Sequence, residues 1–164
     1  MNTENKSFTP PAIKDLWSTP RGLFNKLNDE FNFTLDVAAS DENHLCDNYI
    51  TEEMDGLTSA WGKSNWCNPP YSNIMPWVKV AKKWASNGSV VCMLVPADTS
   101  VKWFKLAYDS CSEVRFISGR ISFINADTGL PVNGNNKGSV IFIWKSPRLI
   151  TRSKVTLVNR SDLI

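Results

Sequence analysis

A strand that ends in two prolines places strong limits on how this chain can fold. Residues 65–73 read NWCNPPYSN, in which an apolar pair is followed by an amide, two prolines and a tyrosine. Proline has no N–H to donate to a sheet, so Pro69 and Pro70 must lie beyond the strand end. Their fixed φ angles make residues 68–71 a rigid platform at the edge of a sheet.

Apolar runs alternate with amphipathic segments along the rest of the chain, which predicts an α/β fold. The expected helices are 20–31, 76–86 and 100–111, and the expected strands are 33–37, 66–67, 89–97, 113–124 and 139–146, with a weak strand near 48–50. Thr19 is placed to cap the first helix. We expect a three-layer sandwich around a mostly parallel sheet, with the last two strands forming a terminal antiparallel hairpin.

The length of 164 residues and the hydrophobic content of 42% suit one domain. Residues 1–14 are expected to be a flexible tail, 15–146 the single domain, and 147–164 a basic C-terminal segment. That segment has two interpretations: a phosphate contact, or else an added edge strand or a dimer contact. No apolar stretch reaches about 18 residues and the start lacks a signal-peptide pattern, so a cytoplasmic protein is expected.

Charge is distributed unevenly between the two parts of the chain. Residues 1–62 hold four Lys and Arg against eleven Asp and Glu, 4 − 11 = −7, whereas residues 63–164 hold fourteen against five, 14 − 5 = +9. This asymmetry indicates either a half that faces a polyanion or a solvated scatter of charge.

Cysteine and histidine give no sign of a metal site. Cys46, Cys67, Cys92 and Cys111 lack CxxC spacing, which predicts reduced core thiols, and no metal is expected. The single histidine, His44, is expected to be structural or solvated.

Polar side chains follow the predicted strands at the edge where open α/β sheets bind ligands. Asp36, Asp55 and the platform could share one cleft there. The amine of adenine is a poor nucleophile, and the Asn68 side-chain oxygen with the Pro69 carbonyl can accept its two protons, while Tyr71 stacks on the base. The electrophile that fits is a sulfonium methyl. Each residue also has a structural alternative when it is taken singly. Thr19 could be only a helix cap, and Asp36, Asp55 and the Pro-rich motif could be ordinary turns.

Five segments in order carry a family resemblance: DLWSTP…LF, TLDVAAS, DGL…W, CNPPY and GRISF. Together, from about Asp15 to Trp144, they resemble the phage Dam-type DNA N6-adenine methyltransferases. The resemblance implies a compact Rossmann-like methyltransferase fold that uses S-adenosylmethionine. It also implies methyl transfer to the N6 amine of a flipped adenine in DNA, in the bacterial host of a phage.

The resemblance assigns roles to residues of this chain. Asn68, Pro69, Pro70 and Tyr71 would form the catalytic motif, and the cofactor would contact Trp17, Thr19, Pro20, Asp36, Ala38, Asp55 and Asn68. Within that set, Thr19 would bind the methionine carboxylate and Asp55 would accept from the cofactor's adenine amine. Asp36 would lie in the first cofactor motif, with Ala38 and Ala39 letting the backbone approach. The family also uses an acidic residue to hold the ribose hydroxyls of the cofactor, and in this chain Asp41, Glu42 and Asp47 are all candidates for that role.

Only about ninety residues follow Tyr71, so no separate recognition domain is expected. Recognition would fall to loop 125–138 and the basic C-terminal segment, with a GATC target suggested by resemblance and promiscuous methylation as the alternative. The DNA-binding candidates are Lys79, Lys82, Arg120, Lys137, Arg148 and Arg152, although Arg120 could instead pair within the sheet. We expect double-stranded DNA as the partner of a monomer or weak dimer. Other readings are methylation of RNA or a protein glutamine, and a catalytically idle DNA- or cofactor-binding module.

Overall fold

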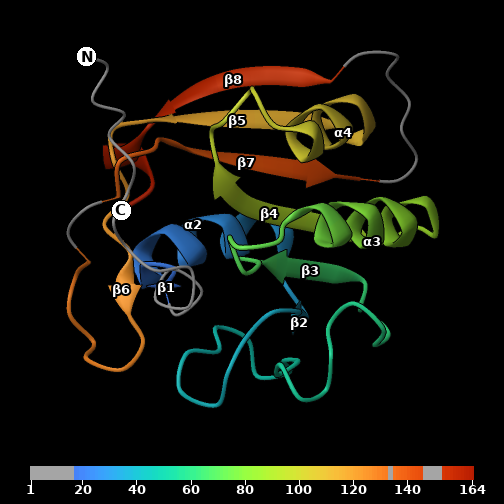
Figure 1. The fold of residues 1–164 in the computed structure, drawn as a ribbon, viewed down its shortest axis with the longest axis horizontal. Helices are drawn as coiled ribbons and strands as arrows, with labels where there is room; N and C mark the ends of the chain where they lie inside the picture. Colours follow the sequence, from blue (N-terminus) through green and yellow to red (C-terminus); the bar gives the residue numbers. More distant parts are fainter. Residues whose placement is uncertain (1–16, 133–134, 146–152) are drawn as a thin grey trace, which may run out of the picture.

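The computed structural model describes residues 17–132, 135–145 and 153–164, which form an α/β fold on a mixed six-stranded sheet (Figure 1). The strand order is β2-β3-β4-β7-β5-β8. The bounds are Leu35–Asp36 (β2), Ser64–Cys67 (β3), Val90–Pro96 (β4), Glu113–Ser118 (β5), Ser139–Trp144 (β7) and Lys154–Asn159 (β8). A separate two-stranded antiparallel ribbon joins β1, Trp17–Ser18, to β6, Ile124–Asn125.

The three described helices lie close to the predicted ranges. They are α2 (Arg21–Phe31), α3 (Met75–Ser86) and α4 (Lys102–Ser110), and a single 3-10 turn, η1, covers Arg160–Asp162. Helix α2 begins after Pro20 without a side-chain cap, so the predicted capping role of Thr19 is wrong. Its hydroxyl group is used elsewhere, as described below.

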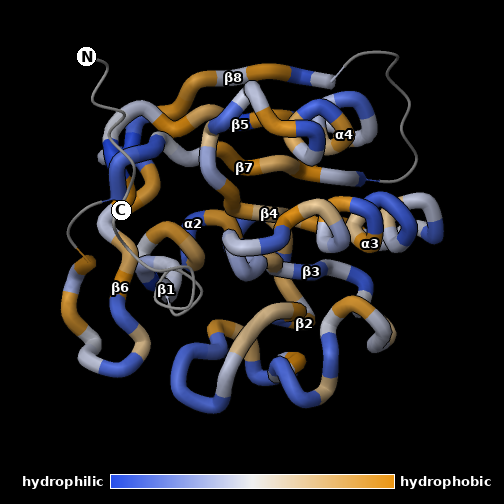
Figure 2. Tube along the Cα trace, in the orientation of Figure 1, coloured by the Kyte–Doolittle hydropathy of each residue, from blue (hydrophilic) through white to orange (hydrophobic). Residues whose placement is uncertain are grey.

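Apolar residues alternate along the central strands and divide the core between the two faces of the sheet. On β4, Val91, Met93 and Val95 pack with residues of α3 and α4. The alternate residues Cys92 and Leu94 pack with α2. Helices therefore cover both faces, and Figure 2 shows the hydrophobic residues gathered on β4 and β7.

Strand direction sets the position of the site. Strands β2, β3 and β4 pair in parallel, so their carboxyl ends lie at one edge of the sheet. Strand β7 runs antiparallel to β4 and β5, and β5 pairs in parallel with β8. The predicted antiparallel pairing of strands β5 and β7 is confirmed. This pair does not end the sheet, because β7 lies between β4 and β5, and β8 adds a further strand beyond β5.

The predicted strand 113–124 is wrong in length. It ends at Ser118, because Gly119 takes a φ of +96°, a left-handed conformation that turns the chain. Residues beyond the turn leave the main sheet, and Ile124–Asn125 pair with β1 instead. This break brings the segment 121–125 to the N-terminal ribbon.

The described part of the C-terminal segment completes the sheet. Strand β8 pairs with β5 from Glu113 to Ser118. Of the two alternatives for the C-terminal segment, residues 154–159 therefore take that of an added edge strand. Leu163 is 7% exposed and packs in the same cluster as α2. Among the described residues, no helix is long and apolar enough to cross a membrane.

Candidate active site

The NPPY platform follows β3 at the carboxyl edge of the sheet, as predicted. Cys67 ends β3 and pairs with Met93, while Asp36 at the end of β2 pairs with Trp66. Asn68 is therefore the first residue beyond the paired part of β3, so hydrogen bonds between strands do not fix its position. The amide must be held by contacts from outside the sheet.

Those contacts come from the N-terminal ribbon. The Asn68 Nδ2 group donates to the Trp17 carbonyl oxygen at 3.2 Å and to the Thr19 hydroxyl oxygen at 3.1 Å. A carbonyl oxygen can only accept, so the atom facing Trp17 must be the nitrogen. Both amide protons are thereby used, and Asn68 Oδ1 is turned away from these two partners as an acceptor.

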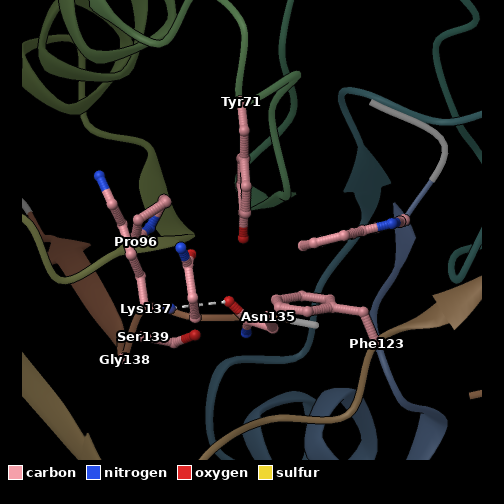
Figure 3. Close-up of a pocket in the computed structure, with 9 residues that line it drawn as sticks. Tyr71, Pro96, Phe123, Asn135, Lys137, Gly138 and Ser139 are labelled. Carbon is pink, nitrogen blue, oxygen red and sulfur yellow. Dashed lines mark hydrogen bonds between the residues drawn. The ribbon is translucent and has the colours of Figure 1, made fainter. Parts of the chain in front are cut away.

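An aromatic pocket is lined in part by Trp17, whose carbonyl accepts from this amide, and by Tyr71 of the same motif (Figure 3). Its lining residues are Trp17, Tyr71, Pro96, Phe123, Asn135, Asn136, Lys137, Gly138 and Ser139. Tyr71 meets Phe123 edge to face with ring centroids 6.0 Å apart, and Trp17 stacks on Phe123 at 5.6 Å. The three rings form an apolar wall suited to a flat aromatic ligand.

Tyr71 is fixed at both ends of its side chain. Its ring packs against both core clusters, and its hydroxyl donates to the Leu94 carbonyl at 3.3 Å. Burial raises the pKa of Tyr71 far above its ordinary value, so the hydroxyl stays protonated. The residue acts as a neutral, rigid ring.

The opposite side of the pocket is polar and comes from the segment before β7. Figure 3 shows Pro96 and Lys137 across the pocket from Phe123, and Asn135 beside the Phe123 ring. The Lys137 ammonium pairs with the Asp98 carboxylate at 2.7 Å, and this hydrogen bond lowers the pKa of Asp98 to about 2. Asn135 accepts from the Lys137 backbone N–H at 3.3 Å. The pocket lining thus adds the polar residues Asn135 and Lys137 to its aromatic wall, with the Lys137 ammonium paired to Asp98.

Asp36 is a buried carboxylate that folds the loop after β2. It is 3% exposed and accepts from the backbone N–H groups of Leu45 at 3.1 Å and Ala38 at 3.5 Å. Burial raises the pKa of Asp36 to about 6, against the opposing effect of these hydrogen bonds. Its carboxylate holds the loop backbone in place.

Asp55 occupies a turn packed against the end of β2. A Cβ on Gly56 would lie 2.3 Å from the Val37 carbonyl oxygen, which shows how closely this turn approaches the strand end. The exposed carboxylate of Asp55 accepts from Leu57 N and from the Thr58 hydroxyl, both at 3.0 Å. The structure thus brings Asp55 to the same edge as Asp36 and Asn68.

The ribose candidates lie in the loop between these two residues. Asp41 accepts from the Tyr49 hydroxyl at 2.7 Å, whereas Glu42 and Asp47 are exposed.

His44 stacks on Tyr49 with ring centroids 4.1 Å apart and forms a hydrogen bond with the Cys46 carbonyl, which favours the structural role of the two expected for it. All four cysteines are free and buried, as predicted. In the described ranges, no three His, Cys, Asp or Glu side chains form a metal-binding group.

The predicted DNA-binding residues are only partly brought together. Lys137 lines the pocket, and Arg120 follows β5 at the carboxyl edge, where its carbonyl accepts from Arg160. Lys79 and Lys82 are exposed on α3 but do not line the pocket. Arg148 and Arg152 lie outside the described residues.

Comparison with known proteins places this arrangement in a family. The family model for DNA N-6-adenine-methyltransferase (Dam) matches residues 6–164. The chain belongs to this family. It is 40% identical over 155 residues to the DNA N-6-adenine-methyltransferase of Escherichia phage T1, covering 84% of this chain and 65% of that protein. It is 37% identical over 145 residues to the protein of the same name from Haemophilus phage HP1 (strain HP1c1), covering 85% and 84%.

Membership of the Dam family confirms the resemblance inferred from the five ordered segments. The chain spans just under two thirds of the phage T1 relative, at 65%. Phe123 and Pro96 were not assigned site roles from the sequence. Phe123 belongs to the segment GRISF, so that motif was the available signal, whereas Pro96 gave none. Asn135 and Arg160 lie in loop 125–138 and in the basic C-terminal segment, which were both expected to take part in recognition.

Proposed function

We propose that this chain transfers a methyl group from S-adenosylmethionine to the N6 amine of adenine in DNA. The observation that carries the proposal is the orientation of Asn68, whose Nδ2 is bound by Trp17 and Thr19 so that Oδ1 is left to accept. The aromatic pocket that Trp17 and Tyr71 help to line suits an extruded base. Membership of the Dam family and the names of both phage relatives support this substrate.

The residues of the platform act by orienting the amine. Asn68 Oδ1 and the Pro69 carbonyl oxygen accept the two N6 protons, which directs the nitrogen lone pair away from the ring plane. When bound, S-adenosylmethionine would supply an electrophilic methyl group, so that a new N–C bond would form as its S–C bond breaks and one N6 proton would pass to solvent. Tyr71 and Phe123 hold the base in the pocket.

The cofactor would lie between the N-terminal ribbon and the loops after β2. Within the described part of the chain, the buried indole Nε1 of Trp17 has no hydrogen-bond acceptor, and an unpaired buried donor favours a ligand. Because Thr19 accepts from Asn68, its own hydroxyl proton is free to donate to the methionine carboxylate. Pro20, Asp36, Ala38 and Asp55 complete the proposed set, with Asp36 shaping the loop that carries Ala38.

The finer description of the fold belongs to the same proposal. Helices on both faces and three adjacent parallel strands support a three-layer, Rossmann-like methyltransferase domain over residues 15–146. Residues 1–14 would precede it, and the segment 147–164 would follow it and add the edge strand β8 to its sheet. Since the proposed substrate is DNA and both relatives are phage proteins, we place the activity in the cytoplasm of a bacterial host.

DNA would approach the carboxyl edge of the sheet as a duplex, bound by a monomer or weak dimer. Lys137 and Arg120 are the proposed phosphate contacts at that edge, with Lys79 and Lys82 on α3 as more distant candidates and Arg148 and Arg152 as candidates from the sequence alone. Loop 125–138 would contribute to recognition. Phosphate neutralisation predicts a binding affinity that falls steeply with salt.

Asp55→Ala is expected to raise the dissociation constant for S-adenosylmethionine about tenfold, the scale of one lost hydrogen bond of about 1.4 kcal/mol. Calorimetry without DNA measures this constant. Thr58→Val is the matched control, because it removes the Thr58–Asp55 bond but keeps the carboxylate. An equal rise in both variants would assign the effect to the turn, and an unchanged constant in Asp55→Ala would remove Asp55 from the site.

Tyr71→Ala is expected to weaken binding of methylatable DNA by about 1–3 kcal/mol through lost stacking on the flipped base. Tyr71→Phe keeps the ring and removes only the bond to the Leu94 carbonyl, so its DNA affinity should stay close to that of the unaltered protein. Gel-shift titration with S-adenosylhomocysteine present gives both constants. Equal weakening in the two variants would contradict stacking.

The proposed substrate is tested by transfer of a tritiated methyl group. The purified protein is offered duplex DNA, RNA and protein in parallel, and label should enter the DNA, in adenine. Label in RNA or in protein glutamine would favour the alternative acceptors. Cofactor binding without transfer to any of them would favour an idle binding module.

A further inference from the structure

The hydroxyl of Thr19 has no role in the helix that it precedes. A threonine before a helix ordinarily caps it, but the first residue before α2 is Pro20, and no side chain caps the helix. Thr19 is nevertheless 5% exposed, and its hydroxyl lies 3.1 Å from Asn68 Nδ2, 49 residues away in the chain. Burying this hydroxyl would be costly without such a partner.

The ribbon strand that precedes Thr19 is held by pairings that do not involve Asn68. Trp17 pairs with Asn125 and Ser18 with Ile124, and the Trp17 ring stacks on Phe123. The Trp17 carbonyl and the Thr19 hydroxyl are therefore presented to Asn68 from a backbone that is already paired. A rotation of the Asn68 amide by 180° would turn its oxygen toward the Trp17 carbonyl, which cannot donate, so this carbonyl fixes which end of the amide faces it, whereas the Thr19 hydroxyl could bond either end.

We infer that Thr19 is a positioning residue that holds the Asn68 amide in the orientation selected by the Trp17 carbonyl. This inference rests on the proposed methyl transfer and goes beyond the cofactor contact that family resemblance implies for Thr19. The hydroxyl accepts from Asn68 Nδ2 at 3.1 Å, and this second bond restricts rotation of the amide, so that Oδ1 stays available to the acceptor amine. Loss of the hydroxyl leaves only the Trp17 carbonyl to hold the amide.

A double-mutant cycle tests whether Thr19 acts through Asn68. Thr19→Val keeps the side-chain shape without the hydroxyl, and its single-turnover rate at saturating cofactor and DNA should fall about tenfold, whereas Thr19→Ser stays near the unaltered rate. In an Asn68→Ala background, Thr19→Val should cause no further loss. The same tenfold loss in both backgrounds, or none in the first, would overturn the inference. Calorimetry separates any change in cofactor affinity from the rate.

Nuclear magnetic resonance gives a readout that does not depend on activity. The side-chain NH₂ signals of Asn68 are assigned by their loss in Asn68→Ala. They should shift in Thr19→Val and return toward their original positions in Thr19→Ser. Unchanged signals in Thr19→Val would contradict the positioning role even if the protein methylated no substrate, while an inactive protein with shifted signals would count against the proposed function alone.

Discussion

Asn68→Ala is expected to lower the rate of methyl transfer by about two orders of magnitude or more, the scale for removing one positioned polar group from a developing charge. The substitution removes the Oδ1 acceptor and both bonds to the N-terminal ribbon, but it lies beyond the β3 ladder and outside the core. The fold should therefore persist. Single-turnover transfer of a labelled methyl group measures the rate.

Cofactor affinity provides the control for that prediction. If Asn68 acts mainly on the acceptor amine, calorimetry should give Asn68→Ala and the unaltered protein similar dissociation constants for S-adenosylhomocysteine. Methylation of DNA by Asn68→Ala at the original rate would show that the catalytic assignment is wrong. A loss explained wholly by weaker cofactor binding would move Asn68 from the catalytic set to the cofactor set.

Asp36→Asn is expected to become more stable relative to the unaltered protein as the pH rises. The pKa of Asp36 is about 6 in the folded state and 3.8 in its ordinary range, so the folded state binds more protons between these values. The folding free energy that this carboxyl contributes is therefore lost as the pH rises from about 4 to about 6, and the full loss is about 3 kcal/mol. Between pH 4.5 and pH 8 the loss is about 2 kcal/mol. Asparagine cannot ionise and escapes this loss.

The comparison uses urea unfolding of both proteins at the two pH values. Asparagine also places an N–H group near one of the backbone donors at Leu45 and Ala38, which adds a constant destabilisation. Only the change in the difference between the two proteins is therefore informative. A difference that stays constant with pH would mean that Asp36 keeps an ordinary pKa in the folded protein.

The helices and the position of the platform were predictable because they depend on local patterns. The apolar spacing of Leu23 and Leu27 defines one face of α2, and the lack of N–H groups at Pro69 and Pro70 ends β3. Asp36 and Asn68 could be placed at one edge because consecutive parallel strands share a carboxyl end.

The strand order and the partners of the catalytic amide could not be read from the sequence. The insertion of β7 between β4 and β5 depends on pairings across long stretches of chain, and the turn at Gly119 sends residues 124–125 to β1. The bond from Asn68 to Thr19 spans 49 residues, and no local spacing indicates it. A threonine before a helix instead favoured the capping role that the structure does not show.

The central claim is most directly tested by mapping modified bases in plasmid DNA from a methylation-deficient bacterial host that expresses this protein. N6-methyladenine should accumulate with the unaltered chain and fall to the background of the empty vector with Asn68→Ala at equal expression. The modified sites would also reveal whether methylation follows a sequence such as GATC or is promiscuous. Plasmid adenine that stays unmodified with the unaltered protein would contradict the proposed activity.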